Sequence, residues 1–145
     1  MSTSTASPSA AKQATTGPLL ENIEVGPVSD SNFEVRFEPS PRRVRAFVDG
    51  VAIADSARAM LMLETGRLPV YYLPIADVRR DLLRPSGHKV ASARKGEAVY
   101  FNIETKARVV ENAAWQYPVP LKGIPDISGF IAFHWNLMDA WFEED

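Results

Sequence analysis

The chain has 145 residues, of which 46% are hydrophobic and 23% are charged, and its formal net charge is −2. These proportions fit one globular domain that buries its own core. The absence of cysteine excludes disulfides, thiolate zinc sites and a cysteine nucleophile. No apolar stretch reaches the ~18 residues of a membrane span, no signal-like apolar segment opens the sequence, and the charge balance argues against a nucleic-acid partner. We therefore expect a cytoplasmic single-domain protein with no membrane partner.

Residues 1–27 are predicted to form a disordered tail. Met1 to Gly17 consist almost entirely of Ser, Thr, Ala and Pro, with Lys12 as the only charged side chain. Such a composition buries too little apolar surface to offset the entropy that is lost on ordering. A small apolar cluster between Leu19 and Val25 leaves open whether the end of the tail docks on the domain. The folded domain is predicted to span residues 28–145.

The first predicted elements are strands. Residues 33–37 alternate apolar and charged side chains, which is the period of a half-buried strand. Strand-like patterns follow in residues 43–48 and 51–55, on either side of Asp49-Gly50. A two-residue turn between strands requires positive φ at both of its central residues, so Asp-Gly at this point predicts a hairpin.

Two segments have helical spacing. Residues 74–83 are predicted to form a short helix, because Pro74 suits the first helical position and Ile75, Val78 and Leu82 share one face. In residues 56–66 the spacing and the propensities favour a helix. The apolar run within that segment, residues 60–63, is also typical of a buried strand, so the pattern leaves both structures open.

Strands predominate in the rest of the chain. The predicted strands are residues 70–73, 88–93, 97–104, 108–110 and 129–135, and residues 140–143 continue as strand or close the chain. Residues 112–120, rich in Trp, Tyr and Pro, are predicted to be a loop, and residues 126–128 a single helical turn. Short strands at this spacing predict a mainly-β fold with a barrel-like or bent sheet.

Five blocks of the sequence resemble the bacterial and fungal "domain of unknown function 427" family over residues 33–145. They are Arg43-Val44-Arg45 with Ala54-Asp55-Ser56, Tyr71-Tyr72-Leu73-Pro74, Lys95-Gly96-Glu97-Ala98-Val99-Tyr100, Asn112-Ala113-Ala114-Trp115-Gln116-Tyr117-Pro118, and Ile131-Ala132-Phe133 with Asp139-Ala140-Trp141. The resemblance implies a β-tent-like domain of two bent antiparallel sheets with one or two short helices. B-type methionine sulfoxide reductases and the ligand-binding domain of cereblon have that shape. It favours strand for residues 58–64.

The chain also departs from the family that it resembles. Many members carry Cys-Pro shortly before the Lys-Gly pair, where this chain has Ser92-Ala93-Arg94. Thiol chemistry at that position is therefore impossible here. The cysteine pairs that bind zinc in many β-tent domains are absent as well.

Four residues in the resembling blocks are candidate ligand-binding residues: Tyr72, Asn112, Trp115 and Tyr117. Flat aromatic rings bind flat or cationic ligands, and aromatic side chains in a loop need either a surface to pack on or a ligand. This hypothesis predicts that Trp115 and Tyr117 are partly exposed at the mouth of a cavity. The alternative is that they fill the core, as we expect for Trp135 and Trp141.

Glu64 and Lys95 are the candidate catalytic residues. A carboxylate and an ammonium group that converge in a pocket, with the amide of Asn112 and, as a further candidate, the ring of His88, can orient a polar ligand or transfer a proton. The alternative is a buried Glu64–Lys95 ion pair that fixes the geometry of the sheets. The sequence alone leaves both open.

The remaining charged residues suggest less specific roles. Residues 79–95 contain six basic side chains and the single acid Asp81. This basic segment is either a solvated face or a surface for an anionic partner. The only histidines, His88 and His134, lack ligand spacing, so the sequence predicts no metal site and no cofactor. The acidic residues 143–145 are expected to be solvated. We interpret the chain as a small-molecule-binding domain, with a Glu64/Lys95 enzyme and a basic interaction module as the alternatives.

Overall fold

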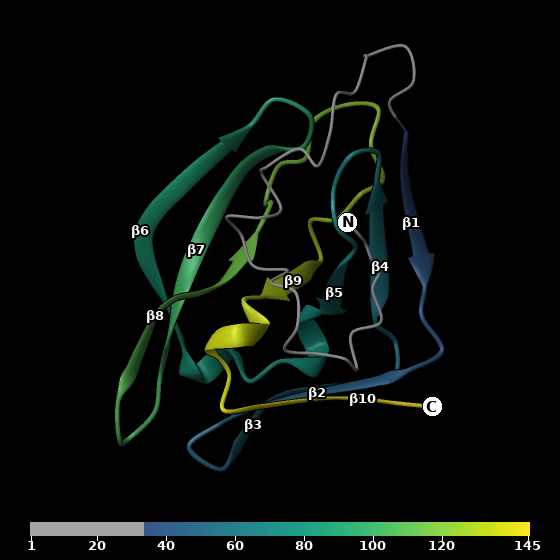
Figure 1. The fold of residues 1–145 in the computed structure, drawn as a ribbon. Coiled ribbons are helices and arrows are strands. Elements are labelled where there is room, and N and C mark those ends of the chain that lie inside the picture. The colour runs from purple at the N-terminus through teal and green to yellow at the C-terminus, as the bar shows by residue number, and fades with distance from the viewer. Residues whose placement is uncertain (1–33) are drawn as a thin grey trace.

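A computed structural model gives the fold and describes residues 34–145 (Figure 1). The predicted tail, residues 1–27, and the start of the predicted domain, residues 28–33, lie outside the described residues. Within residues 34–145, ten strands form two antiparallel sheets, and the helices are single 3-10 turns. The prediction of a mainly-β domain with two antiparallel sheets is confirmed.

The larger sheet, sheet A, has seven strands in the order β1-β4-β5-β9-β8-β7-β6. In that order they are β1 (Val35–Pro39), β4 (Met60–Glu64), β5 (Val70–Pro74), β9 (Phe130–Phe133), β8 (Val109–Gln116), β7 (Gly96–Glu104) and β6 (Leu83–Ser92). Sheet A is strongly curved, so that β6 and β7 stand opposite β1 and β4 (Figure 1). The curvature gives the sheet a concave face.

The smaller sheet, sheet B, has three strands in the order β10-β2-β3 and lies across one end of sheet A, at the bottom of Figure 1. Its strands are β2 (Arg43–Val48), β3 (Val51–Ser56) and β10 (Ala140–Glu144). The β2–β3 hairpin is the one that the sequence predicts. Asp49 and Gly50 have φ values of 52° and 75°, as the two-residue turn requires.

The ambiguous segment before β5 is a strand. β4 pairs with β1 on one side, Met62 opposite Phe37, and with β5 on the other, Met60 opposite Tyr72. Pairing with two neighbouring strands gives this segment hydrogen bonds and burial that outweigh its local preference for a helix. The apolar run at residues 60–63 therefore forms a strand. The strand that the family resemblance favours is therefore correct.

The predicted helix over residues 74–83 is wrong in its type and length. The segment forms two 3-10 turns, η3 (Ile75–Asp77) and η4 (Arg80–Leu82). Between them Val78 is extended, with φ −118° and ψ 140°, and forms an isolated bridge with Ala54 of β3. That tertiary contact interrupts the helical hydrogen bonds that Pro74 and the apolar spacing favour.

Two other boundaries also differ from the predictions. The strand predicted to begin at residue 88 begins at Leu83, so residues 85–87 lie inside β6, where its register with β7 shifts between Pro85 and Lys89. Residues 126–128 form no helix, whereas a third 3-10 turn, η5 (Trp135–Leu137), follows β9.

The predicted loop over residues 112–120 is largely a strand. β8 continues to Gln116, with Trp115 opposite Tyr100 of β7 and Ala132 of β9. β8 is a central strand covered on both faces, so its buried residues do not alternate with polar ones. Asn112 also hides the strand pattern: its φ is 51°, and the register with β7 shifts nearby, between Phe101 and Ile103.

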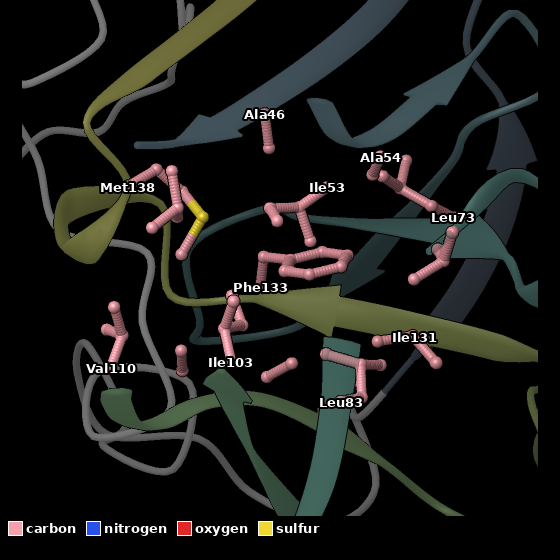
Figure 2. Close-up of a cluster of buried hydrophobic side chains, with 14 of the residues drawn as sticks. Ala46, Ile53, Ala54, Leu73, Leu83, Ile103, Val110, Ile131, Phe133 and Met138 are labelled. Carbon is pink, nitrogen blue, oxygen red and sulfur yellow. The ribbon is translucent and has the colours of Figure 1, made fainter. Parts of the chain in front are cut away.

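The buried hydrophobic side chains form two clusters on opposite faces of sheet A. The inter-sheet core lies between sheets A and B and contains Ala46 and Ile53 from sheet B and Leu73, Ile131 and Phe133 from sheet A (Figure 2). The concave core includes Tyr72, Tyr100 and Trp115. Because neighbouring residues of a strand point to opposite faces, Trp115 and its neighbour Gln116 belong to different sides of the sheet.

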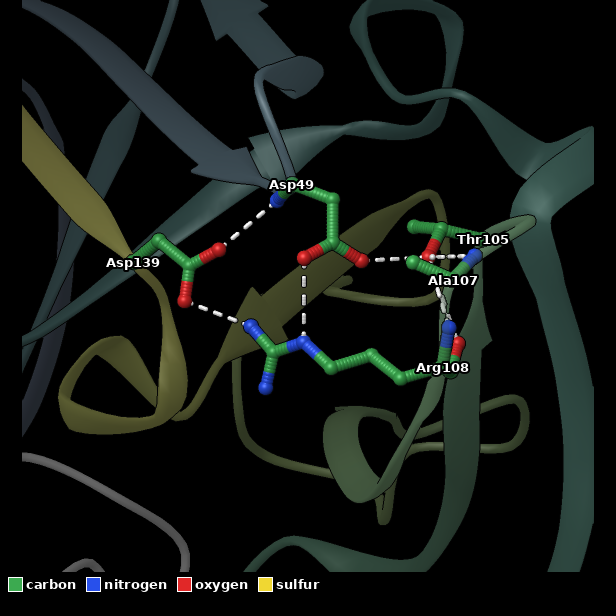
Figure 3. A network of polar contacts seen from close by, with 5 residues as sticks. All are labelled: Asp49, Thr105, Ala107, Arg108 and Asp139. Carbon is green, nitrogen blue, oxygen red and sulfur yellow. Dashed lines mark hydrogen bonds and ion pairs between the residues drawn. The ribbon is translucent and has the colours of Figure 1, made fainter.

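A polar network ties the tips of the two sheets together (Figure 3). Arg108, in the β7–β8 turn region, donates to Asp49 Oδ1 at 3.1 Å and to Asp139 Oδ1. The second oxygen of Asp139 accepts the backbone N–H of Asp49 at 2.7 Å. This Arg108 clip therefore joins the hairpin turn of sheet B, the β7–β8 turn of sheet A, and the segment that leads into β10.

Candidate functional site

The most unusual polar feature is a buried ion pair between two sequence-predicted residues. Lys95 Nζ lies 2.7 Å from Glu64 Oε1, and the side chains of Lys95 and Glu64 are 0% and 2% exposed. Arg67 Nε lies 3.5 Å from the other carboxylate oxygen, Glu64 Oε2, which accepts no hydrogen bond among the described residues. One carboxylate thus faces two cationic groups in a largely dehydrated site.

The curvature of sheet A brings the two partners together. Glu64 is the last residue of β4, and the alternation of the strand places it on the same face as Met62 of the concave core. Lys95 lies in the β6–β7 turn, where its backbone N–H donates to Ser92 Oγ at 3.1 Å. β4 and the β6–β7 turn are near opposite edges of sheet A, so the ion pair spans its concave face.

An aromatic wall adjoins the ion pair. Lys95 Nζ lies 5.8 Å from the centre of the Tyr117 ring, within the range of a cation–π contact. Behind it, the rings of Tyr72 and Trp115 are packed edge to face with centres 6.4 Å apart, and Trp115 Nε1 donates to the Tyr72 hydroxyl at 3.4 Å. Tyr117 thus contacts Lys95 directly, and Tyr72 and Trp115 belong to the same buried cluster as Tyr117.

The expected exposure of the two loop aromatics is wrong. Trp115 and Tyr117 are both 0% exposed, as is Tyr72. The error follows from the missed strand: Trp115 lies on β8, between two strand neighbours, and its ring points into the concave core. The alternative prediction, that Trp115 fills the core, agrees with this burial.

A close backbone contact covers the Lys95 turn. The N–H of Leu121 donates to the carbonyl oxygen of Lys95 at 3.0 Å. Gly96 has φ +115°, and a Cβ atom at this position would lie 2.9 Å from the carbonyl oxygen of Val119. Glycine is required here for both reasons, because residues 119–121 lie directly against the turn that carries Lys95.

Two further candidates lie apart from this group. Asn112 sits at the irregularity in β8, where its backbone N–H donates to Asn102 Oδ1 at 2.9 Å, and its own Oδ1 is buried with no hydrogen bond among the described residues. His88 is exposed, and its ring centre lies 4.7 Å from that of Tyr100. Asn112 and His88 thus contact Asn102 and Tyr100, respectively.

The basic residues 79–95 do not form one uniform cationic face. Arg79 pairs with Asp81 through two hydrogen bonds of 2.9 and 2.8 Å, and this bonding lowers the pKa of the Asp81 carboxyl. Lys95 is buried, and Arg84 is bonded to backbone carbonyls. Within residues 34–145, no group of three or more histidine or acidic side chains is placed to hold a metal ion.

Sequence reasoning missed a second buried carboxyl group. Glu143, expected to be solvated, has a side chain that is 0% exposed; it accepts a 2.8 Å hydrogen bond from Trp141 Nε1. Burial raises the pKa of Glu143, and burial next to Glu143 raises the pKa of Tyr71 to about 12. The period of two in β10 was the available signal, because it places Glu143 on the same face as Trp141.

Comparison with known protein families agrees with this fold. Residues 36–144 match the model of the family described as Domain of unknown function (DUF427). The match covers most of the chain, which therefore belongs to this family, as the sequence blocks indicate. A search of the curated proteins found no match. Within residues 34–145, no helix combines the length and the hydropathy needed to cross a membrane.

Proposed function

We propose that the chain binds a small polar molecule at the Glu64–Lys95 ion pair, against the ring of Tyr117. In this proposal Lys95 and Glu64 supply the polar contacts, and Tyr117 supplies a flat surface. Tyr72 and Trp115 support that ring from the concave core and hold the site in shape. Asn112, the remaining candidate from the sequence, lies at the β8 irregularity. A movement of that irregularity on binding would make it a ligand contact.

The observation that carries the proposal is the burial of the ion pair. Removing two charges from water costs several kcal/mol per ion, and replacing such pairs by apolar residues often leaves stability unchanged or increases it. A protein that only needed to join the edges of sheet A would do so more cheaply with apolar side chains. Lys and Glu side chains are almost never fully buried unless they are paired, and the additional proximity of Arg67 and the Tyr117 ring supports this interpretation.

In this proposal, access to the site depends on residues 118–123, because the ion pair itself is buried and this segment follows the buried Tyr117. Val119 and Leu121 in this segment are 77% and 44% exposed, so they contribute little apolar burial that would resist opening. The described backbone hydrogen bond from this segment to the turn is the one between Leu121 and Lys95. Displacement of this segment would expose the ion pair to a ligand.

The test is a thermal-shift screen of the full chain against a library of polar metabolites, followed by calorimetric titration of the compounds that stabilise it. The decisive variant is Glu64→Gln/Lys95→Met, which removes both charges together and leaves an amide oxygen for Arg67. Because no buried charge of the pair is orphaned, we expect this variant to fold and to lose the binding. A matched control is Arg36→Met/Glu38→Gln, which removes a cation and a carboxylate in the same way from an exposed pair.

The control is expected to bind as the wild type does. Equal binding by the Glu64→Gln/Lys95→Met variant would contradict the proposal, and so would a screen in which no compound stabilises the wild type. Single variants are less informative, because leaving one charge of a buried pair without its partner typically costs about 3–5 kcal/mol.

A second candidate function is acid–base catalysis at the same pair. The specific observation is the direct 2.7 Å contact between an ammonium and a carboxylate, which can relay a proton if a substrate reaches either group. Turnover of a bound compound by the wild type, kept in the Arg36→Met/Glu38→Gln control and lost in the Glu64→Gln/Lys95→Met variant, would favour the enzyme. Saturable binding without turnover would favour the binding domain.

A further inference from the structure

A separate cavity lies on the other side of sheet A. It has a volume of about 390 Å³, is partly open to solvent, and is lined by Ile75, Arg80, Asp81, Leu83, Phe101, Gln116 and Ile131. Phe101 and Gln116 directly follow Tyr100 and Trp115 in the sequence, so strand alternation directs them away from the concave core. The cavity is thus distinct from the Glu64–Lys95 site, and its volume falls in the range of small-molecule pockets.

Backbone hydrogen bonds and core packing hold the walls of the cavity in place. Ile75 N–H donates to the carbonyl oxygen of Gly129 at 3.1 Å, and Arg79 N–H donates to that of Ile53 at 2.8 Å. These bonds attach the η3–η4 segment to the turn before β9 and to β3. Leu83 and Ile131 are 8% and 2% exposed and form part of the inter-sheet core. A preformed cavity binds ligands at a lower conformational cost.

Two polar side chains, Arg80 and Gln116, line the cavity together with Asp81 and the apolar residues. The Arg80 side chain is exposed and forms no ion pair or hydrogen bond among residues 34–145, whereas the neighbouring Asp81 carboxylate is occupied by both contacts with Arg79. Gln116 donates from Nε2 to the carbonyl oxygen of Ser128 at 2.6 Å. This bond orients the amide and leaves its carbonyl oxygen as an acceptor.

We infer that this cavity binds a small monocarboxylic acid with a hydrophobic body. The carboxylate pairs with the Arg80 guanidinium, whose planar donors match the two carboxylate oxygens. The hydrophobic body lies on Phe101 and the aliphatic walls formed by Ile75, Leu83 and Ile131. Inorganic anions would lack the apolar contact, and neutral apolar molecules would lack the charged one.

Nuclear magnetic resonance titration of the ¹⁵N-labelled full chain with 3-phenylpropionate tests this inference. We expect saturable shifts at residues of the cavity, including the side-chain amide of Gln116. The neutral isostere 3-phenylpropanamide is expected to bind about tenfold more weakly or worse, because it lacks the hydrogen bonds between charged groups. Acetate, which lacks the hydrophobic body, is expected to bind more weakly still.

Arg80→Gln should remove the preference for the acid over the amide while leaving the fold unchanged, because Arg80 is exposed. Arg36→Gln makes the same change at another exposed arginine, on β1, and should keep that preference. The inference is overturned if the acid and the amide bind equally, if Arg80→Gln keeps the preference, or if no saturable shifts occur at the cavity. None of these outcomes depends on the ion pair of the proposed function.

Discussion

Truncation of Trp115 is the sharpest test of the concave core. The side chain is 0% exposed and packs between Tyr72 and Tyr100, with ring centres 6.4 and 6.2 Å away. Burial of an aromatic side chain removes on the order of 200 Å² from water, worth about 5 kcal/mol at ~25 cal/mol per Å². Measured truncations of buried Trp or Phe to Ala cost about 3–5 kcal/mol, and we expect Trp115→Ala to fall in that range.

The assay is urea unfolding followed by far-ultraviolet circular dichroism, which does not depend on the fluorescence of the lost indole. Trp115→Phe keeps an aromatic ring and is expected to cost clearly less, although it loses the Nε1–H bond to Tyr72. Val119→Ala, at a position that is 77% exposed, should change the free energy of unfolding by less than about 0.5 kcal/mol.

A cost of about 1 kcal/mol or less for Trp115→Ala, with an unchanged denaturant slope, would refute the reasoning. It would mean that the indole is not part of a closely packed core, and it would restore the hypothesis of a partly open aromatic site at this position. A cost in the upper range removes Trp115 from the groups that touch a ligand and leaves Tyr117 with the ion pair.

Three further predictions concern other parts of the fold. Burial raises the pKa of Glu143 above the ordinary value of 4.5, so the wild type should lose stability as the pH rises from 4.5 through that raised pKa. Glu143→Gln does not titrate and should therefore become more stable relative to the wild type over this range. Urea unfolding at a series of pH values tests this, and a difference that does not change with pH would contradict it. Gly96→Ala should cost about 1–3 kcal/mol through its positive φ and the contact with the Val119 carbonyl, whereas Gly129→Ala, where a Cβ meets no atom within 4 Å, should be close to neutral in the same melts. Added zinc and chelators should leave the melting temperature unchanged, since the chain has no cysteine and two histidines; stoichiometric zinc by elemental analysis would contradict this.

The sequence predicts the fold best where local chemistry and tertiary structure agree. The β2–β3 hairpin depends on Asp49-Gly50 and on alternation in its own strands, so it is visible locally. Residues 74–83 show the opposite case, because the bridge between Val78 and Ala54 that prevents a continuous helix joins distant segments. β8 was missed because a central strand has two buried faces and therefore loses the alternation on which strand prediction depends.

The sequence predicted which residues form the candidate site better than it predicted their geometry. Glu64 and Lys95 are in contact, but their burial results from the curvature of sheet A, which no local pattern encodes. Arg67 was not predicted, although its position three residues after Glu64 could have suggested a contact. The cavity at Arg80 could not have been predicted, because its wall residues come from six elements, η3, η4, β6, β7, β8 and β9, that meet only in the folded protein.

The pairing of β10 with β2 has a consequence for the order of folding. Trp141 lies opposite Ala46, and every strand of sheet A except β1 lies between these two segments in the sequence. Closing so long a loop costs entropy before the contact repays it, and folds rich in such non-local pairings acquire them slowly. We therefore expect the β2–β3 hairpin to form early and β10 to pair with it later. Until then the face of the hairpin that belongs to the inter-sheet core is not shielded at that edge, and intermediates at this stage would be the ones most prone to associate.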